Sequence, residues 1–229
     1  MALTKLAIFD VAGTTAKDDD LVVRAFQKAV IGMGVEPDSA DLAEKTDYVN
    51  ATMGQRKIDV FLHLFDGDLD LANQAHDKFV AAYIELVSAG ELEEFEGISD
   101  FFRELRNRGI GIAITTGFPR EILDRILTNL NWLPLIDVSV ASSEVDEGRP
   151  APDMIFRSIE LFNVTTGANV STEEIVVVGD TQADMQSGVR AGAPLVVGVT
   201  SGAHSATELA AAGATTVLIG STELLSLLG

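Results

Sequence analysis

The composition of this 229-residue chain excludes several classes of protein. Its formal net charge of −19 would repel a polyanionic backbone, so nucleic acid is not expected as a partner. No apolar run approaches the roughly 20 residues that a membrane-spanning helix needs, and the absence of cysteine excludes disulfides and cysteine nucleophiles. We therefore expect a cytoplasmic protein with no membrane partner.

Short apolar runs rich in β-branched residues predict six strands, and helical patterns lie between them. Continuous runs of this kind are typical of strands buried on both faces of a parallel sheet. The alternation predicts an α/β fold with a doubly wound parallel sheet. The strands are expected at residues 3–9, 111–115, 136–140, 174–178, 195–199 and 216–219, with helices at 98–108 and 119–131 among those between them.

The first two predicted strands are separated by about 100 residues, far more than the 10–15-residue helix of an ordinary crossover. We expect residues 16–90 to form an inserted α-helical cap domain, and residues 1–15 and 91–229 to form the core. Two linkers, near residues 17–20 and 88–95, would join the two parts. Helical patterns within the insertion lie at residues 20–33, 39–48, 54–65 and 71–87.

Polar side chains and small residues follow four of the predicted strands, where ligands of open α/β sheets bind. Three carboxylates among them could surround Mg²⁺, a hard cation that prefers oxygen ligands. Hydroxyls and one guanidinium could hold phosphoryl oxygens, which leaves Asp10 free to attack phosphorus in line. In chain order these residues are Asp10, Gly13 and Thr14, then Thr115, Thr116 and Gly117, then Arg149, and finally Asp180 and Asp184.

Four stretches of the chain resemble the motifs of the haloacid dehalogenase superfamily, and more narrowly phosphonoacetaldehyde hydrolase (phosphonatase) and its phosphonatase-like relatives. The resemblance implies a Rossmann-like core, a helical cap after the first strand, and Mg²⁺-dependent hydrolysis of a small phosphorylated or phosphonate substrate through an aspartyl phosphate. It covers nearly the whole chain. The stretches are FDVAGTT, ITTG, GRPAPDMIF and VVVGDTQADMQSGVRAGA.

The same resemblance implies a role for each residue of these motifs. Asp10 is expected to be the nucleophile and a metal ligand, the Ala12 carbonyl and Asp180 complete the protein's metal ligands, and Asp184 supports them. The phosphoryl group is expected to be bound by Thr115 or Thr116 and by Arg149.

Ala12 stands where phosphatases and phosphomutases of the superfamily carry an aspartate that protonates the leaving group. General acid catalysis is worth roughly 10² to 10⁴ in rate, so its loss would slow the departure of an alkoxide. Phosphonatases share this alanine, and a cap lysine forms a Schiff base with their substrate aldehyde. The segment MGQRKID resembles theirs, which assigns that lysine to Lys57 and the substrate-specificity loop to Met53 and Gly54.

Lys57 must be partly neutral near pH 7 to react, which burial or the neighbouring Arg56 could arrange. Three positions depart from the phosphonatase pattern: Asp20 replaces a cysteine, Val60 a histidine and Phe118 a tyrosine. Two alternatives therefore stay open, namely a phosphatase for esters or acyl phosphates with a good leaving group, and a non-catalytic or signalling phospho-acceptor module. By resemblance, a homodimer through the cap helices is also expected.

Overall fold

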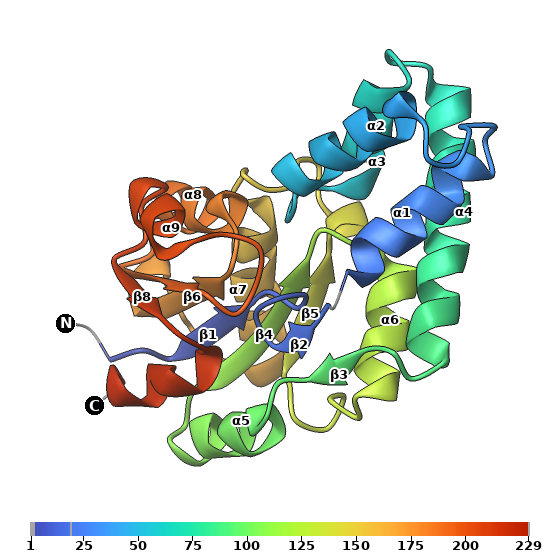
Figure 1. Cartoon of the computed structure of the whole chain (residues 1–229). Helices are drawn as coiled ribbons and strands as arrows, with labels where there is room; N and C mark the ends of the chain where they lie inside the picture. The colour runs from blue at the N-terminus through green and yellow to red at the C-terminus, as the bar shows by residue number, and fades with distance from the viewer. Residues whose placement is uncertain (1–2, 19, 229) are drawn as a thin grey trace.

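The computed structural model describes residues 3–18 and 20–228, and its centre is a parallel six-stranded sheet (Figure 1). The strand order is β5-β4-β1-β6-β7-β8, so the chain crosses over from one side of β1 to the other. This order and the helices around it confirm the predicted doubly wound, Rossmann-like α/β fold. The strands are β1 (Leu6–Phe9), β4 (Gly111–Thr116), β5 (Val138–Ala141), β6 (Ile175–Gly179), β7 (Leu195–Val199) and β8 (Thr216–Leu218).

Helices cover both faces of the sheet, which is why β1 is apolar at every position. Ile8 belongs to the hydrophobic cluster of Phe162 on α7, whereas Phe9 points to the opposite face. There the ring centroid of Phe9 lies 5.6 Å from those of both Phe101 and Phe102 on α5. The helices of this part are α5 (Ile98–Asn107), α6 (Arg120–Asn129), α7 (Asp153–Thr166), α8 (Gln182–Ala191) and α9 (Ala206–Ala211), with 3-10 turns at η1 (Ser142–Glu144), η2 (Thr172–Glu174) and η3 (Ser221–Ser226).

Four further helices lie together on one side of the sheet (Figure 1). Helix α4 packs against α1 and α3 and also against α6. Two short antiparallel strands, β2 (Ala16–Lys17) and β3 (Glu93–Glu94), pair where the chain enters and leaves this helical group. The division into residues 1–15, 16–90 and 91–229 stays a prediction. The four helices are α1 (Leu21–Ile31), α2 (Ala40–Ala51), α3 (Lys57–Leu64) and α4 (Leu69–Ser88).

Side-chain caps fix two of these helix starts. The hydroxyl of Ser39 accepts a hydrogen bond from the backbone N–H of Leu42 at 3.1 Å, and Asp68 caps α4 in the same way through its carboxylate. Within residues 3–18 and 20–228, no helix combines the length and the apolar character needed to cross a bilayer.

Several elements are shorter than the sequence predicts. Strand β1 begins at Leu6 instead of residue 3, because the side chain of Leu3 is 75% exposed and adds nothing to the buried sheet. Helix α3 begins at Lys57 instead of residue 54, because Gly54 has a φ of +82° that no α-helix contains. Strand β8 ends at Leu218, before the exposed Ile219.

Candidate active site

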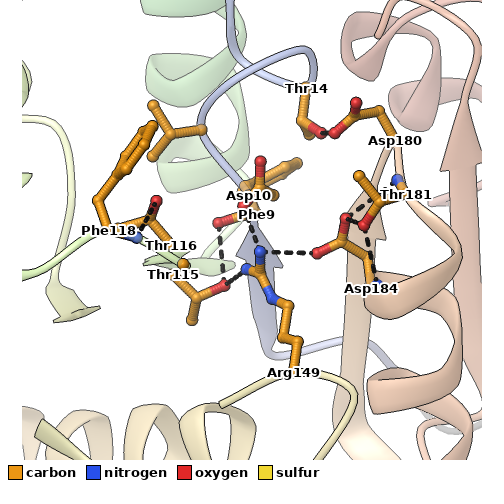
Figure 2. A network of polar contacts seen from close by, with 12 residues as sticks. Phe9, Asp10, Thr14, Thr115, Thr116, Phe118, Arg149, Asp180, Thr181 and Asp184 are labelled. Carbon is orange, nitrogen blue, oxygen red and sulfur yellow. Dashed lines mark hydrogen bonds and ion pairs between the residues drawn. The ribbon is translucent and has the colours of Figure 1, made fainter. Parts of the chain in front are cut away.

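The parallel register brings the ends of β1, β4 and β6 to one edge of the sheet (Figure 2). Phe9 is aligned with Ile114 on one side and with Val178 on the other. Asp10 follows Phe9 directly, and its backbone N–H donates to the carbonyl oxygen of Val178 at 3.0 Å. Asp180 therefore begins its loop beside Asp10, as the sequence predicts.

Three buried carboxylates meet at this edge. One oxygen of each of Asp10, Asp180 and Asp184 lies within 4.8 Å of those of the other two. Asp180 is held by the hydroxyl of Thr14 at 2.9 Å and by the backbone N–H of Ala203 at 2.7 Å. Asp184 lies in the first turn of α8, where its Oδ2 accepts the backbone N–H of Thr181 at 3.1 Å.

Arg149 lies behind this cluster and joins it to β4. Its Nη1 contacts an oxygen of Asp10 and lies 2.9 Å from Oδ1 of Asp184, and its Nη2 donates to the hydroxyl of Thr115 at 2.5 Å. In this arrangement Arg149 and Thr115 hold the Asp10 carboxylate, while Thr116 lines the cavity in front of it. A phosphoryl-binding role for Arg149 and Thr115 stays a prediction.

The three carboxylates are buried, and the cation of Arg149 is paired with two of them. Burial raises the pKa of Asp10 to about 7, against the opposing charge of Arg149 and with a further increase from Asp184. Burial, together with the carboxylates of Asp10 and Asp184, raises the pKa of Asp180 well above its usual value. Three oxygen donors this close, with one guanidinium between them, form a set that suits a hard divalent cation such as Mg²⁺.

Gly13 and Thr14 both contact Asp180 of the carboxylate cluster. Gly13 has a φ of +82°, and a Cβ there would lie 2.4 Å from Oδ2 of Asp180. The backbone of Gly202 also packs against Asp180, since a Cβ on Gly202 would lie 2.0 Å from the same oxygen. The loop that carries Gly202 and Ala203 was not among the predicted site residues, because it follows β7 without any charged or hydroxyl side chain that contacts Asp180.

A cavity of about 570 Å³ opens in front of Asp10, between the sheet edge and the helical group α1–α4. Most of the predicted site residues line it, whereas Thr14, Thr115, Arg149 and Asp184 lie behind it. From the predicted list, the cavity is lined by Asp10, Ala12, Gly13, Met53, Gly54, Lys57, Thr116, Gly117 and Asp180.

The loop before α3 packs closely against the loops that follow β4 and β6. A Cβ on Gly117 would lie 2.6 Å from the carbonyl oxygen of Gln55, and a Cβ on Gly54 would lie 2.4 Å from the hydroxyl of Thr181. The backbone N–H of Lys57 also donates to the carbonyl of Gly117 at 3.4 Å. Glycines at these contacts let the two parts of the chain approach at backbone distance.

Lys57 is the first residue of α3, and only 5% of it is exposed. Its Nζ lies 5.7 Å from the ring centroid of Phe118. Burial lowers the pKa of Lys57 to about 8, while the carboxylates of Asp18 and Asp10 act against the decrease.

The sequence suggests that Arg56 lowers the pKa of Lys57, but Arg56 is not among the groups that shift this pKa most. Arg56 turns away, since its Nε donates to Asp59 at 2.8 Å and its Nη1 to the carbonyl of Asp146 at 3.0 Å. The cation that does lower the pKa of Lys57 is Arg149.

The three positions that depart from the phosphonatase pattern have different surroundings. Phe118 and Asp20 line the cavity, whereas Val60 is buried in the hydrophobic core of the helical group. Two polar residues near Lys57 were not predicted. Asp18 lines the cavity and accepts a hydrogen bond from the hydroxyl of the buried Tyr83 at 3.2 Å.

Comparisons with known proteins agree with this fold. The sequence model described as haloacid dehalogenase-like hydrolase matches residues 7–198. The chain therefore belongs to the haloacid dehalogenase-like hydrolases, and it is an enzyme of that superfamily.

The individual relatives share only a modest fraction of their residues with this chain. The chain is 30% identical over 207 residues to a phosphonoacetaldehyde hydrolase of Paraburkholderia xenovorans, covering 84% of this chain and 73% of the relative. It is 30% identical over 173 residues to the protein CbbY of Cereibacter sphaeroides, covering 73% and 74% of the two chains. The crystal structure of a hydrolase from Pseudomonas syringae superimposes with a TM-score of 0.81 at 22% identity, covering 98% of this chain and 97% of the other.

Proposed function

We propose that this hydrolase is a Mg²⁺-dependent, phosphonatase-like enzyme that uses Asp10 as its nucleophile. The observation that carries the proposal is that Asp10 and the buried Lys57 line one cavity from opposite parts of the chain. A carboxylate aimed at phosphorus and an amine aimed at the leaving group are the two reactive groups that cleavage of a carbon–phosphorus bond needs.

Asp10, Asp180, the Ala12 carbonyl and the nearby Asp184 would hold the metal ion. When bound, Mg²⁺ neutralises charge on the phosphoryl oxygens and on the carboxylates around it. The ion pair with Arg149 favours the ionised form of Asp10 and orients its carboxylate. The Thr116 and Gly117 segment, which lines the cavity beside Asp10, supplies polar contacts for the phosphoryl group.

The reaction with phosphonoacetaldehyde has three stages. The neutral amine of Lys57 condenses with the aldehyde, takes up one proton, releases water and forms a protonated imine. Asp10 then attacks phosphorus, the carbon–phosphorus bonding pair moves onto carbon to give an enamine, and Asp10 becomes an aspartyl phosphate. Protonation of the enamine carbon and hydrolysis of the imine release acetaldehyde, and water releases phosphate from Asp10. The imine replaces the acid that Ala12 does not supply.

Release of phosphate from phosphonoacetaldehyde in the presence of Mg²⁺ tests this proposal. We expect turnover by the native protein and by Lys78→Ala, which removes an exposed lysine of α4. We expect no turnover by Lys57→Ala. A native protein that is inert towards phosphonoacetaldehyde overturns the phosphonatase assignment.

A second candidate is a phosphatase for esters or acyl phosphates with a good leaving group. It is favoured by the relatives, which include a phosphoglycolate phosphatase of Aquifex aeolicus. In that case Lys57→Ala would retain activity on acetyl phosphate. Membership of a hydrolase family argues against the third alternative, a phospho-acceptor module without turnover.

We further propose that residues 16–90 act as a cap whose closure excludes water from the cavity. The paired strands β2 and β3 lie at the two predicted linkers and would be the hinge. A cytoplasmic location and a homodimer through the cap helices remain predictions.

A further inference from the structure

The carboxylates of the predicted site are assigned to the nucleophile and the metal ion, so another side chain is needed to exchange protons with Lys57. Imine formation requires that the amine lose a proton and that the hydroxyl of the carbinolamine gain one before it leaves as water. Neither Val60 nor Phe118 can move a proton, and Ala12 cannot either. The group that does this must lie elsewhere on the wall of the cavity.

Asp18 is held in place from two different elements. Its Oδ2 accepts the backbone N–H of Val22 in the first turn of α1 at 3.3 Å. Its Oδ1 accepts the hydroxyl of Tyr83, on α4, at 3.2 Å. The carboxyl group is thus fixed at the cavity wall, and it is not the mobile linker side chain that its acidic neighbours suggest.

Tyr83 connects Asp18 to the surroundings of Lys57. It is fully buried, and its ring centroid lies 4.5 Å from that of Phe118. The Nζ of Lys57 lies over the same Phe118 ring, at 5.7 Å from its centroid. Lys57, Phe118, Tyr83 and Asp18 therefore lie in one cluster, and all of them except Tyr83 line the cavity.

We propose that Asp18, oriented by Tyr83, is the proton donor and acceptor for the amine of Lys57. The proposal rests on the proposed function, because it assumes that Lys57 reacts with a carbonyl group.

The Asp18 carboxylate first takes a proton from the Lys57 ammonium, which leaves a neutral amine and a protonated Asp18 carboxyl. As the amine adds to the aldehyde, a carbon–nitrogen bond forms, the carbonyl π pair moves to oxygen, and a proton of the nitrogen passes to that oxygen to give a carbinolamine. The protonated Asp18 carboxyl then donates its proton to the hydroxyl, the carbon–oxygen bond breaks, and water leaves. Asp18 is now a carboxylate beside the positive imine. Hydrolysis of the imine runs through the same steps in reverse.

The ionisation of the cluster agrees with this role. Burial raises the pKa of Asp18, although the hydrogen bonds from Val22 and Tyr83 act against the increase. Burial and the adjacent Asp18 raise the pKa of Tyr83 well above its usual value, so Tyr83 remains a donor. The other charged groups that act on Lys57 are Asp10, Asp180 and Arg149, and Asp20 acts on Asp18.

Reductive alkylation measures imine formation without any phosphorus chemistry. The probe is acetaldehyde with cyanoborohydride, and peptide mass spectrometry gives the rate of labelling at Lys57 as a function of pH. The variants are Asp18→Asn, which keeps the shape and the oxygen that faces Val22, Asp18→Glu, and Tyr83→Phe. Asp77→Asn, an exposed position on α4, is the control for the loss of one charge.

We expect Asp18→Asn to slow labelling of Lys57 by about 10²-fold. Loss of the Asp18 carboxylate also lets the pKa of Lys57 fall further, so the pH midpoint of labelling moves down. Asp18→Glu should restore part of the rate, and Tyr83→Phe should reduce it less than Asp18→Asn does. A residue that only caps α1 would change stability but neither the rate nor the midpoint.

The two proposals fail in different ways. If native Lys57 is labelled and phosphate is released, but Asp18→Asn labels at the native rate and midpoint, the role of Asp18 is overturned while the proposed function stands. If native Lys57 is not labelled above the exposed lysines, both are overturned. Far-ultraviolet circular dichroism of each variant separates loss of folding from loss of reactivity, and Tyr83→Phe gives an independent result should Asp18→Asn not fold.

Discussion

The guanidinium of Arg149 forms a buried ion pair with the carboxylate of Asp10, and the same group contacts Asp184. One cation therefore balances part of the charge of two carboxylates that are far apart in the sequence. Breaking a buried pair by removing one partner leaves an uncompensated charge, which is more costly than the pair itself is stabilising.

The first prediction concerns this pair. We expect Arg149→Met to lower the free energy of unfolding by about 3–5 kcal/mol, because Asp10 and Asp184 lose their buried partner. Urea unfolding measures the change. Arg157→Met removes the exposed pair with Glu160 and should cost about 1 kcal/mol or less. Equal losses in the two variants would contradict the account.

Lys57 should destabilise the folded protein at neutral pH. Its pKa is about 8 in the folded state against 10.5 ordinarily, so the unfolded chain binds more protons in this window and stability rises as pH increases from about 8 to 10.5. Lys57→Met should therefore be more stable than the native protein at pH 7 by at most about 3 kcal/mol. The difference should shrink by pH 10.5. A difference that is constant over pH would show that the pKa of Lys57 is not lowered in the folded protein.

The position of the loop before α3 depends on Gly117. A methyl group there would meet the carbonyl oxygen of Gln55, so Gly117→Ala should push the loop that carries Lys57 away from the core. We expect kcat/KM to fall by about tenfold or more. Gly220→Ala is the matched control, because an added Cβ there meets nothing within 4 Å. Unchanged kinetics in Gly117→Ala would mean that the close contact between this loop and Gly117 has no part in turnover.

Mg²⁺ should stabilise the folded protein through the carboxylate cluster. At a metal concentration 100 times its dissociation constant, the gain is about 2.7 kcal/mol, visible as a rise in the melting temperature. Asp180→Asn should lose most of this rise, whereas Asp77→Asn on the surface of α4 should keep it. A rise of the same size in Asp180→Asn would place the metal elsewhere.

The parts of the site that follow strands could be predicted from the sequence, and the parts that depend on distant packing could not. Asp10 and Asp180 are set by local position, since each directly follows a buried strand and the parallel register brings them together. Asp18 lies in an acidic stretch typical of a solvated linker, and its partner Tyr83 is 65 residues away on another helix. Only the packing of α4 against the first linker and α1 reveals this pair.

A similar limit applies to Gly13 and Thr14. The sequence suggests a loop that contacts substrate, and the structure shows that both residues pack against Asp180. The burial of Lys57 also depends on tertiary contacts, because the helical pattern of α3 alone is compatible with a solvated lysine.

The central claim is that Lys57 forms the imine and Asp10 breaks the carbon–phosphorus bond. Borohydride reduction in the presence of phosphonoacetaldehyde and Mg²⁺, followed by peptide mass spectrometry, tests both roles at once. We predict that native Lys57 carries an ethyl group, since carbon–phosphorus cleavage precedes reduction, and that Lys57 of Asp10→Asn carries the intact phosphonoethyl group. An adduct on another lysine, or an ethyl group on Lys57 of Asp10→Asn, would contradict the account.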